Sequence, residues 1–499
     1  MPTPDPKPRP LDHLTLLGKP SACALILRDQ TLDFAALEDA VGRLAGALLA
    51  AGLDVGDRVA TYLPKTLLAC LMPLAAGRAG LVHVPINPAL RRAQVLHILE
   101  DSGAKLLVTA TARAETLGDT GIMRWLESES EAAWQNGAPL PPSACDPNQL
   151  AAILYTSGST GLPKGVMLSH ANMWLGAISV AHYLKLSADD RVLAVLPLSF
   201  DYGQNQLFST WAVGGCVAPL DYLTARDVAR AVERLQITTL AGVPPLWIQL
   251  TEAAWPDAAA SSIGRITNSG GALSRKLVSD LAALFPNADI YPMYGLTEAF
   301  RSTFLQPALV ATNPTSMGTA IPFAEILVVR PDGGLTEADE PGELVHCGPL
   351  VAQGYWRDAA RTALRFRPAP PASTHGGMAV WSGDTVRRDA QGLLHFVGRD
   401  DEMIKVSGNR ISPSEIEEAA YASGVVAEAA AFGFPDARLG QAIVLFARGP
   451  GDGEARLAAH FKAELPSFMI PKQVIWMEEL PRNANGKLDR AALKAELAS

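Results

Sequence analysis

The segment Leu154–His170 combines the groups that a polyphosphate-binding loop needs. Three glycines permit close backbone approach, namely Gly158, Gly161 and Gly165. Hydroxyl donors come from Thr156, Ser157, Ser159 and Thr160, and a positive charge comes from Lys164. The Walker A spacing fails, because Pro163 replaces its second glycine and Gly165 follows the lysine. The segment therefore predicts a phosphate loop of another kind, with a flexible Gly/Ser loop as the alternative.

Further motifs follow this segment in the order Asn268–Ala272, Tyr294–Glu298, Trp381–Asp384, Gly398–Arg410 and Pro481–Lys487. Together the six segments resemble the motifs of the adenylate-forming ligase superfamily, which includes acyl-CoA synthetases, the adenylation domains of peptide synthetases, and luciferases. Several segments are also similar to ligases associated with exosortase A gene clusters and to stand-alone amino-acid ligases that load carrier proteins. The resemblance spans nearly the whole chain.

The resemblance implies a first reaction between two anions, a carboxylate and the α-phosphate of ATP. The product is an acyl-AMP anhydride, and the site must neutralise negative charge as it develops. By this resemblance Thr297 contacts the α-phosphate, Glu298 helps to hold Mg²⁺, and Lys487 bridges the substrate carboxylate and the phosphate. Taken alone, Glu298 is more typical of an exposed turn carboxylate, and Lys487 of a solvated surface lysine.

The nucleoside is expected to lie among residues from three of these motifs. Gly270, Gly271 and Ala272 resemble the turn on the adenine side. Tyr294, followed by Gly295, is expected to stack on the adenine ring, with a core tyrosine as the alternative. Asp384 resembles the carboxylate that accepts hydrogen bonds from the ribose hydroxyls, and Arg399 is expected to assist it.

The acid pocket is expected to include six residues: Phe200, Asp201, Asn205, Val243, Met293 and Arg301. The Phe-Asp pair resembles amino-acid adenylating enzymes, in which the aspartate holds the substrate ammonium. A buried carboxylate needs a partner, which for Asp201 is either a substrate amine, a helix end or a nearby side chain. Arg301 suits a second carboxylate or a polar head, or a structural salt bridge that could include Asp201. These polar groups favour a small polar acid or an amino acid over a long fatty chain.

A second half-reaction needs a thiol, from CoA or from a carrier-protein phosphopantetheine arm. Asp401 aligns with the hinge position of the superfamily, and the segment after it contributes Lys405, Gly408 and Arg410. Rotation at this hinge is expected to withdraw Lys487 and bring in the Gly408 loop, where glycine allows the arm to pass close to the backbone. Such a rotation can limit turnover.

The elements that must position these residues follow an alternating strand–helix pattern. Helices are expected at 34–52, 67–77 and 93–99, strands at 58–63, 81–84 and 105–109, and the same rhythm at 180–295. A compact α+β pattern begins after Asp401. There Ser412–Glu415 predicts a capping box, and strands are expected at 429–434, 442–447 and 474–477 around a helix at 455–464. The expected fold is α/β: a disordered lead-in at 1–10, a large N-terminal domain of layered sheets and helices at 11–400, and a small mobile C-terminal domain at 401–499.

Composition limits the function classes. The chain has 499 residues and a formal net charge of −9, which argues against nucleic acid as a partner. The five scattered cysteines form no Cys-x-x-Cys, and the nine histidines form no HExxH, so a structural or catalytic zinc is not expected. No segment is both apolar and long enough to span a bilayer. We predict a cytoplasmic ligase. The alternatives are a medium- or long-chain fatty acyl-CoA synthetase, a luciferase-like oxygenase, and a catalytically silent relative that binds nucleotide or a carrier protein.

Overall fold

Parallel strands joined by helices build one layer of the larger domain, as the sequence pattern predicts. The structure is a computed structural model that describes residues 4–28, 30–156, 163–399, 404–406, 409–436, 439–450, 453–483 and 486–497. In this layer a seven-stranded sheet has the order β18-β8-β7-β4-β3-β5-β6, with β4, β3, β5 and β6 parallel. Its strands are β3 Arg58–Tyr62, β4 Val82–Pro85, β5 Leu106–Thr109, β6 Met123–Leu126, β7 Leu150–Thr156, β8 Lys164–Ser169 and β18 Gly354–Tyr355.

A second sheet of fourteen strands forms the other layer, with the order β16-β17-β20-β21-β15-β14-β13-β12-β11-β9-β10-β1-β2 and with β19 paired to β20. Five neighbouring strands, β10, β9, β11, β12 and β13, run parallel. This half of the sheet contains β1 Cys23–Leu27, β2 Gln30–Asp33, β9 Arg191–Ala194, β10 Cys216–Pro219, β11 Thr239–Gly242, β12 Arg265–Asn268 and β13 Asp289–Tyr294. The antiparallel half contains β14 Thr303–Phe304, β15 Ser316–Ala320, β16 Glu325–Val329, β17 Pro341–Cys347, β19 Phe366–Pro368, β20 Met378–Arg388 and β21 Leu394–Arg399.

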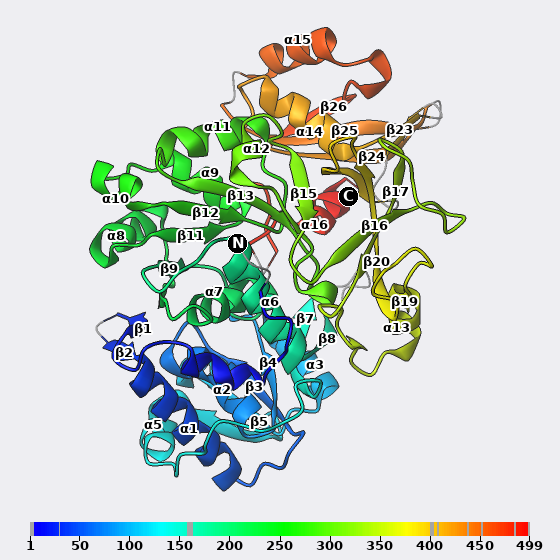
Figure 1. The fold of residues 1–499 in the computed structure, drawn as a ribbon. Helices are drawn as coiled ribbons and strands as arrows, with labels where there is room; N and C mark the ends of the chain where they lie inside the picture. The colour runs from blue at the N-terminus through cyan, green and yellow to red at the C-terminus, as the bar shows by residue number, and fades with distance from the viewer. Residues whose placement is uncertain are drawn as a thin grey trace.

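Two buried helices connect the layers (Figure 1). Helix α6 contacts β7 and β8 of the first sheet, α7 contacts β9 and β10 of the second, and the two helices contact each other. Every residue of α7 is buried, polar ones included. The helices of the larger domain are α1 Phe34–Ala50, α2 Leu67–Arg78, α3 Arg92–Ser102, α4 Thr111–Leu117, α5 Glu127–Gln135, α6 His170–Tyr183, α7 Asp201–Trp211, α8 Ala225–Leu235, α9 Pro244–Glu252, α10 Asp257–Ser262, α11 Arg275–Leu284, α12 Pro307–Val310 and α13 Ala359–Arg365, with the 3-10 turns η1 Leu11–Leu16 and η2 Thr297–Ala299.

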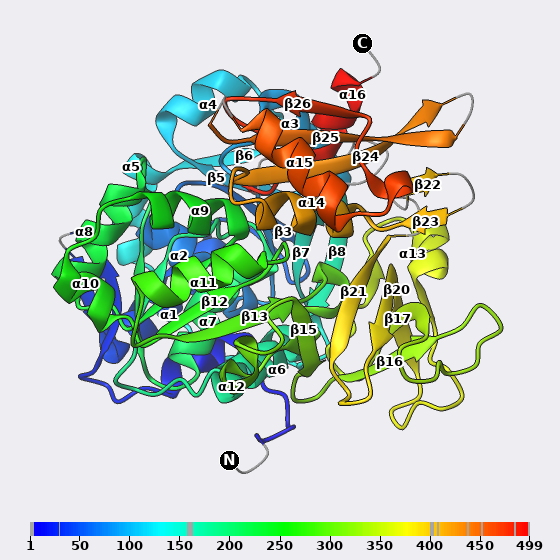
Figure 2. The same ribbon diagram turned by 90° about the horizontal axis from the view of Figure 1, so that it is seen from above.

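The smaller C-terminal domain has its own sheet and its own core. Its apolar clusters contain residues from 404 onward and none from the larger domain. The sheet order is β23-β22-β25-β24, with β26 beside β25. The elements are β22 Ile404–Val406, β23 Asn409–Ile411, α14 Pro413–Ala422, β24 Glu428–Asp436, β25 Gly440–Arg448, α15 Glu454–Glu464, η3 Ser467–Met469, β26 Gln473–Trp476 and α16 Arg490–Glu496. Viewed from above, this domain lies across the larger one (Figure 2).

The predicted elements of both domains are confirmed apart from their end residues. One local prediction is confirmed only in part. Ser412 does cap α14, since its hydroxyl accepts from the backbone N–H of Ser414 at 3.2 Å, but the described contacts include no return bond from Glu415. The capping box is therefore half formed.

Residues 4–10 contain no helix or strand, and the guanidinium of Arg9 lies 5.7 Å from the ring centre of Trp174. The exact domain limits stay a prediction, because residues 400–403 lie outside the described part.

Within the residues that the structure describes, no helix combines the length and apolar character required to cross a bilayer.

A buried ion pair ties the start of the chain to α2, and its loss should destabilise the larger domain. The side chain of Arg78 is 1% exposed, and its Nε lies 3.0 Å from Oδ2 of the fully buried Asp12. We expect Arg78→Met to lower the free energy of unfolding by about 3–5 kcal/mol, because Asp12 would remain buried without a cation. Arg43→Met, which removes an exposed pair with Asp39, is the control and should change it by less than about 1 kcal/mol. Urea unfolding followed by circular dichroism measures both, and equal losses would contradict the interpretation.

Candidate functional site

The predicted site residues follow the carboxyl ends of neighbouring parallel strands. Phe200 comes after β9, Val243 directly follows β11, Gly270 comes after β12, and Glu298 comes after β13. Because β9, β11, β12 and β13 are adjacent and parallel, these segments emerge at one edge of the sheet. Ligands of open α/β sheets bind at this edge.

The predicted phosphate loop joins the antiparallel strands β7 and β8. Thr156 lies opposite Lys164 at the base of this hairpin. The hydroxyl of Thr156 is buried and has no hydrogen-bond partner among the described residues. Ser157, Gly158, Ser159, Thr160 and Gly161 lie outside the described residues. Their predicted role therefore stays a prediction.

Lys164 and Glu298 form an ion pair inside the molecule. Nζ of Lys164 lies 3.2 Å from Oε1 of Glu298 and donates to the hydroxyl of Tyr355 at 2.8 Å. That hydroxyl donates to the same Oε1 at 2.6 Å. The phosphate-loop lysine and the Tyr294–Glu298 motif, separated by more than a hundred residues, therefore meet around one carboxylate oxygen. Glu298 is 6% exposed, so its interpretation as an exposed turn residue is wrong.

Burial and charge act in opposite directions on this cluster. Burial on its own raises the pKa of Glu298, but the Lys164 charge and the Tyr355 hydrogen bond outweigh it and leave the pKa below its usual value. Burial lowers the pKa of Lys164, and Glu298 offsets only part of that change. Burial, together with the neighbouring carboxylate, raises the pKa of Tyr355 far above its usual value. The tyrosine is therefore a permanent donor to the glutamate.

Tyr355 was not predicted as a site residue. It lies on the short strand β18, which pairs with β8, so Tyr355 stands opposite Val166, two residues after Lys164. Its only sequence signal was its place in Gly354-Tyr355-Trp356, which carries no recognisable chemistry. The strand pairing that brings it to Lys164 is non-local, and a single sequence does not reveal it.

Thr297 and Glu298 lie in the 3-10 turn η2, and a strained residue follows the turn. Phe300 has φ 56° and ψ −58°, a region that bulky side chains rarely adopt. Its buried ring occupies the space beside Gly176 of α6, where an added Cβ would lie 2.1 Å from Cδ1 of the ring. The packing of this ring therefore holds the backbone that presents Glu298 on one side and Arg301 on the other.

The structure brings together some of the residues that are predicted to bind the nucleoside. The hydroxyl of Tyr294, which precedes Gly295, donates to the carboxylate of Asp384. Asp384 on β20 stands opposite Arg399 on β21, although the side chain of Arg399 lies outside the described residues. The turn after β12 is fixed by Asn268, whose Nδ2 donates to the carbonyl of Gly271 at 2.8 Å. Gly270, Gly271 and Ala272 are all exposed in this turn. The structure thus joins Tyr294 to Asp384 directly.

Lys487 reaches the larger domain from the C-terminal one. A Cβ placed on Gly270 would lie 2.7 Å from Cε and 3.2 Å from Nζ of Lys487, and 3.5 Å from Val243. Gly270 has φ +81°, so both its conformation and this close approach require glycine. On the same interface between the domains, Arg448 pairs with Glu252 of α9 at 3.0 Å. The lysine is therefore partly buried against the turn that contains Gly270.

Three of the residues predicted for the acid pocket lie at the start of α7. Asp201 is its first residue and Phe200 precedes it, and the Oδ1 of Asp201 accepts from the hydroxyl of Thr297 at 3.4 Å. Oδ2 lies 4.0 Å from Nη2 of Arg301. Asn205 lies one turn further along α7, and its Oδ1 has no partner among the described residues. Met293 on β13 accepts from the hydroxyl of Tyr183 at 2.8 Å.

The predicted hinge and thiol-channel residues are largely beyond the described part of the chain. Asp401 and Gly408 lie outside it. Lys405 is in β22 and Arg410 in β23, where they pair with each other, but their side chains are not described. The hinge therefore stays a prediction.

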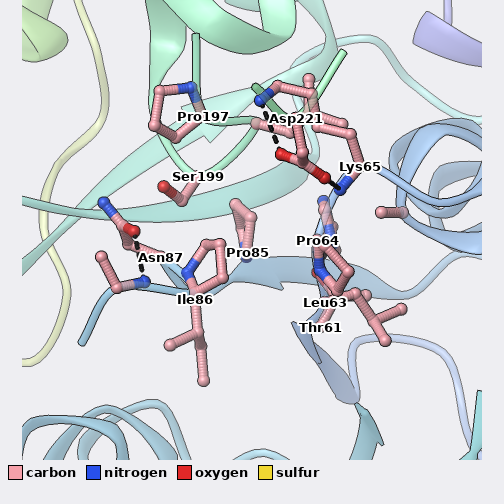
Figure 3. Close-up of a pocket in the computed structure, with 15 residues that line it drawn as sticks. Thr61, Leu63, Pro64, Lys65, Pro85, Ile86, Asn87, Pro197, Ser199 and Asp221 are labelled. Atoms are coloured by element: carbon pink, nitrogen blue, oxygen red, sulfur yellow. Dashed lines mark hydrogen bonds and ion pairs between the residues drawn. The ribbon is translucent and has the colours of Figure 1, made fainter. Parts of the chain in front are cut away.

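A small cavity of about 150 Å³ lies between the two layers, beside the segment that leads into α7 (Figure 3). Strand ends from the first sheet meet Pro197 and Ser199 there, and the Nζ of Lys65 donates to Asp221 at 2.9 Å (Figure 3). Two buried polar atoms of its lining have no described partner, Nδ1 of His83 and the hydroxyl of Ser199. None of the residues predicted for the site lines this cavity.

Comparison with known proteins agrees with this arrangement. The family model of AMP-binding enzymes matches residues 15–356, and that of the AMP-binding enzyme C-terminal domain matches residues 415–487. The chain therefore belongs to the AMP-binding enzyme family, and the resemblance to adenylate-forming ligases is confirmed.

Relatives of two kinds, CoA ligases and carrier-protein ligases, resemble the chain. Feruloyl-CoA synthase of an Amycolatopsis species is 33% identical, with 94% of each chain covered. L-proline--[L-prolyl-carrier protein] ligase of Pseudomonas fluorescens is 29% identical, with 97% of this chain and 98% of that protein covered. A linear gramicidin synthase polypeptide of Brevibacillus parabrevis is 31% identical over 95% of this chain, which spans only 6% of that much longer protein.

A solved relative shows the same fold. O-succinylbenzoate CoA synthetase of Bacillus subtilis is 27% identical and superposes with a TM-score of 0.85, over 98% of this chain and 98% of that one. It has been solved with its acyl-adenylate intermediate and, separately, with ATP and a magnesium ion. The large N-terminal and small C-terminal domains of the present chain are those of this fold.

Removing the Tyr355 hydroxyl should change how stability depends on pH. Because the folded-state pKa of Glu298 is lowered, its ionisation stabilises the fold above the unfolded-state pKa of about 4.3, and this stability is lost as pH falls through the lower folded-state pKa. Tyr355→Phe should raise the folded-state pKa of Glu298, and so weaken this contribution at neutral pH by about 1–3 kcal/mol. Urea unfolding at pH values between roughly 3 and 7 measures this change, because linkage places the effect of the Glu298 carboxyl in that range.

The matched control is Tyr62→Phe. The Tyr62 hydroxyl donates to the carbonyl of Leu90 at 2.8 Å, so this variant loses one hydrogen bond without touching a carboxylate. Its destabilisation should not change with pH. If Tyr355→Phe and Tyr62→Phe show the same pH dependence, the described coupling between Tyr355 and Glu298 is wrong.

Proposed function

We propose that the chain is an ATP-dependent acid–thiol ligase. A carboxylate oxygen of the acid attacks the α-phosphorus of ATP, the bond to the β-phosphate breaks, and acyl-AMP and pyrophosphate form. The thiol of CoA or of a carrier-protein phosphopantetheine then attacks the acyl carbon, loses its proton and releases AMP. The observation that carries this proposal is the approach of Lys487 to Gly270, at the sheet edge that also holds Glu298.

The charges of the site suit the first step. We assign Lys487 to bridging the substrate carboxylate and the α-phosphate, which would reduce the repulsion between the two anions. We assign Lys164 and Thr156, at the base of the glycine-rich loop, to the phosphates. Tyr294 and Asp384 are assigned to adenine and ribose, in line with the resemblance.

The donor set also suits a magnesium ion. The described residues contain no group of three or more His, Cys, Asp or Glu side chains that could hold a metal by themselves. Magnesium is usually bound by one or two carboxylates together with substrate phosphates, and Glu298 is a carboxylate in that position. The ion would neutralise charge on the phosphates, while Lys164 and Tyr355 keep Glu298 ionised and oriented.

The thiol step requires the C-terminal domain to turn. Lys487 now occupies the adenine-side turn, and the polar contacts across the interface include the pair between Arg448 and the exposed Glu252. Exposed ion pairs contribute little free energy, so this pair adds little to the cost of separating the interface. We assign Asp401 to the hinge and Lys405, Gly408 and Arg410 to the thiol channel.

All five cysteines are free, which supports a reducing cytoplasm as the site of action.

The acid is proposed to be a small polar acid or an amino acid. A long fatty chain would have to lie against Asp201, Asn205 and Arg301, which are buried and charged or polar. This burial makes a medium- or long-chain fatty acyl-CoA synthetase the weaker alternative. A silent nucleotide-binding relative is disfavoured because Lys487 is already inserted in the site.

Lys487→Ala is expected to slow adenylate formation by about a hundredfold to a thousandfold, since one charge that stabilises the transition state is lost. ATP–pyrophosphate exchange and direct detection of the acyl-AMP measure this step. Lys494→Ala, in the exposed part of α16, is the control and should leave the rate unchanged. Full-speed anhydride formation by Lys487→Ala would end the proposal.

The substrate class is tested by exchange with a panel of amino acids and the matching acids without the amine. If Asp201 binds an ammonium group, amino acids should support exchange and their deaminated analogues should not. Asp201→Asn keeps the shape and removes the charge, and it should abolish that preference. Equal exchange with both groups of acids in the unaltered enzyme would discard the ammonium role of Asp201.

A further inference from the structure

Arg301 is a buried cation whose donors are mostly unused. The residue is 2% exposed, and its Nη1 donates to the hydroxyl of Ser269 at 3.0 Å. Its Nε and Nη2 are buried and have no hydrogen-bond partner among the described residues. These two nitrogens form the side edge of the guanidinium, the edge that takes a carboxylate in a bidentate manner.

The ion pair with Asp201 provides no hydrogen-bond acceptor for these two nitrogens. Oδ2 of Asp201 lies 4.0 Å from Nη2, which is ion-pair distance and too long for a hydrogen bond. The face of the guanidinium is also occupied, because it lies 4.6 Å from the ring centre of Tyr202. The cation is therefore held in place by Ser269 and Tyr202, while Nε and Nη2 stay open.

Open donors on a buried charge are costly. Leaving a buried polar group without a partner costs about 1–3 kcal/mol, and native structures keep such groups mainly where they have a use. Acceptors are also left open nearby on α7. Asn205 follows Asp201 by one turn, so the two share a helix face, and its Oδ1 has no partner among the described residues. A bound polar ligand would provide hydrogen-bond partners for the two Arg301 nitrogens and for the Asn205 oxygen.

The charge of the pair limits what this group can be. Asp201 and Arg301 together are neutral, so a ligand that brings only a second carboxylate leaves the pocket with a net negative charge. A ligand that brings an ammonium to Asp201 and a carboxylate to Arg301 leaves it balanced. Such a ligand has three charged groups: the ammonium, the carboxylate at Arg301, and the carboxylate that reacts with ATP, which would lie toward Lys487.

We propose that the acid activated by this chain is an amino acid whose side chain ends in a carboxylate, and that Arg301 binds this second carboxylate through Nε and Nη2. Arg301 is thus the specificity-determining residue of the site. The inference rests on the proposed ligase function and deepens it, since it names the substrate class.

The test compares acidic amino acids with their amides. ATP–pyrophosphate exchange is measured with both enantiomers of aspartate, glutamate, asparagine and glutamine. The unaltered enzyme should favour the acid over its amide by about a hundredfold, the size expected for one buried charge pair. Arg301→Gln should lose that preference and activate the amide at least as well as the acid. A merely structural role would not reverse the preference.

Two further variants keep the test decisive. Arg301→Lys retains the charge without the bidentate edge and should weaken the preference, and it replaces Arg301→Gln if that variant does not fold. Arg113→Gln is the matched control, because Arg113 also stacks on a tyrosine, 4.7 Å from the ring centre of Tyr62, and it should retain the preference. Equal exchange with acid and amide in the unaltered enzyme, or equal loss of both in Arg301→Gln, overturns the inference.

A binding measurement separates this inference from the ligase proposal. Aspartate or glutamate should raise the melting temperature of the unaltered protein and not that of Arg301→Gln, with the amides giving the smaller shift. If no acid supports exchange, the ligase proposal fails, and the melting shifts alone decide the role of Arg301. An equal shift for acid and amide overturns that role as well.

Discussion

The site depends on one constraint, the burial of opposite charges where several parallel strands end. Lys164 comes from a hairpin of one sheet and Glu298 from a turn that follows a strand of the other, and they meet at 3.2 Å. Breaking a buried pair costs more than the pair contributes, since the remaining charge has no partner. The two layers are therefore held in a fixed register at the point where the phosphates are expected. Tyr355 completes the pair by donating to the glutamate at 2.6 Å.

Much of this arrangement could be predicted from the sequence, because it depends on local patterns. The apolar periodicity of residues 34–109 predicted α1, α2, α3 and the strands between them, and the ordered motifs predicted the family. What could not be predicted depends on pairing between distant segments. Tyr355 reaches Lys164 only because β18 pairs with β8, and the open edge of Arg301 depends on the side chains of three separate elements.

The two-domain arrangement explains why a lysine near the C-terminus can act in a site built by the larger domain. The apolar clusters of the two domains are separate, so the domains fold around different cores and share only a surface. Lys487 crosses that surface to Gly270, where any side chain would collide with it. A contact made by one long side chain against a glycine can form and break without repacking either core. This arrangement is consistent with the proposal that a rigid set of residues in the larger domain acts together with a lysine that can leave.

A strained backbone conformation lies between two of the charged residues of the site, Glu298 and Arg301. Phe300 adopts φ 56°, which costs on the order of 1–3 kcal/mol for a bulky residue, and its ring is held against Gly176. With ordinary helical dihedrals at this position, the chain would continue the turn that begins at Thr297 and would carry Arg301 away from Asp201 and Ser269. The chain thus bends between Glu298, which faces Lys164, and Arg301, which faces Ser269. The packing of the Phe300 ring at Gly176 supports the backbone on both sides of this bend.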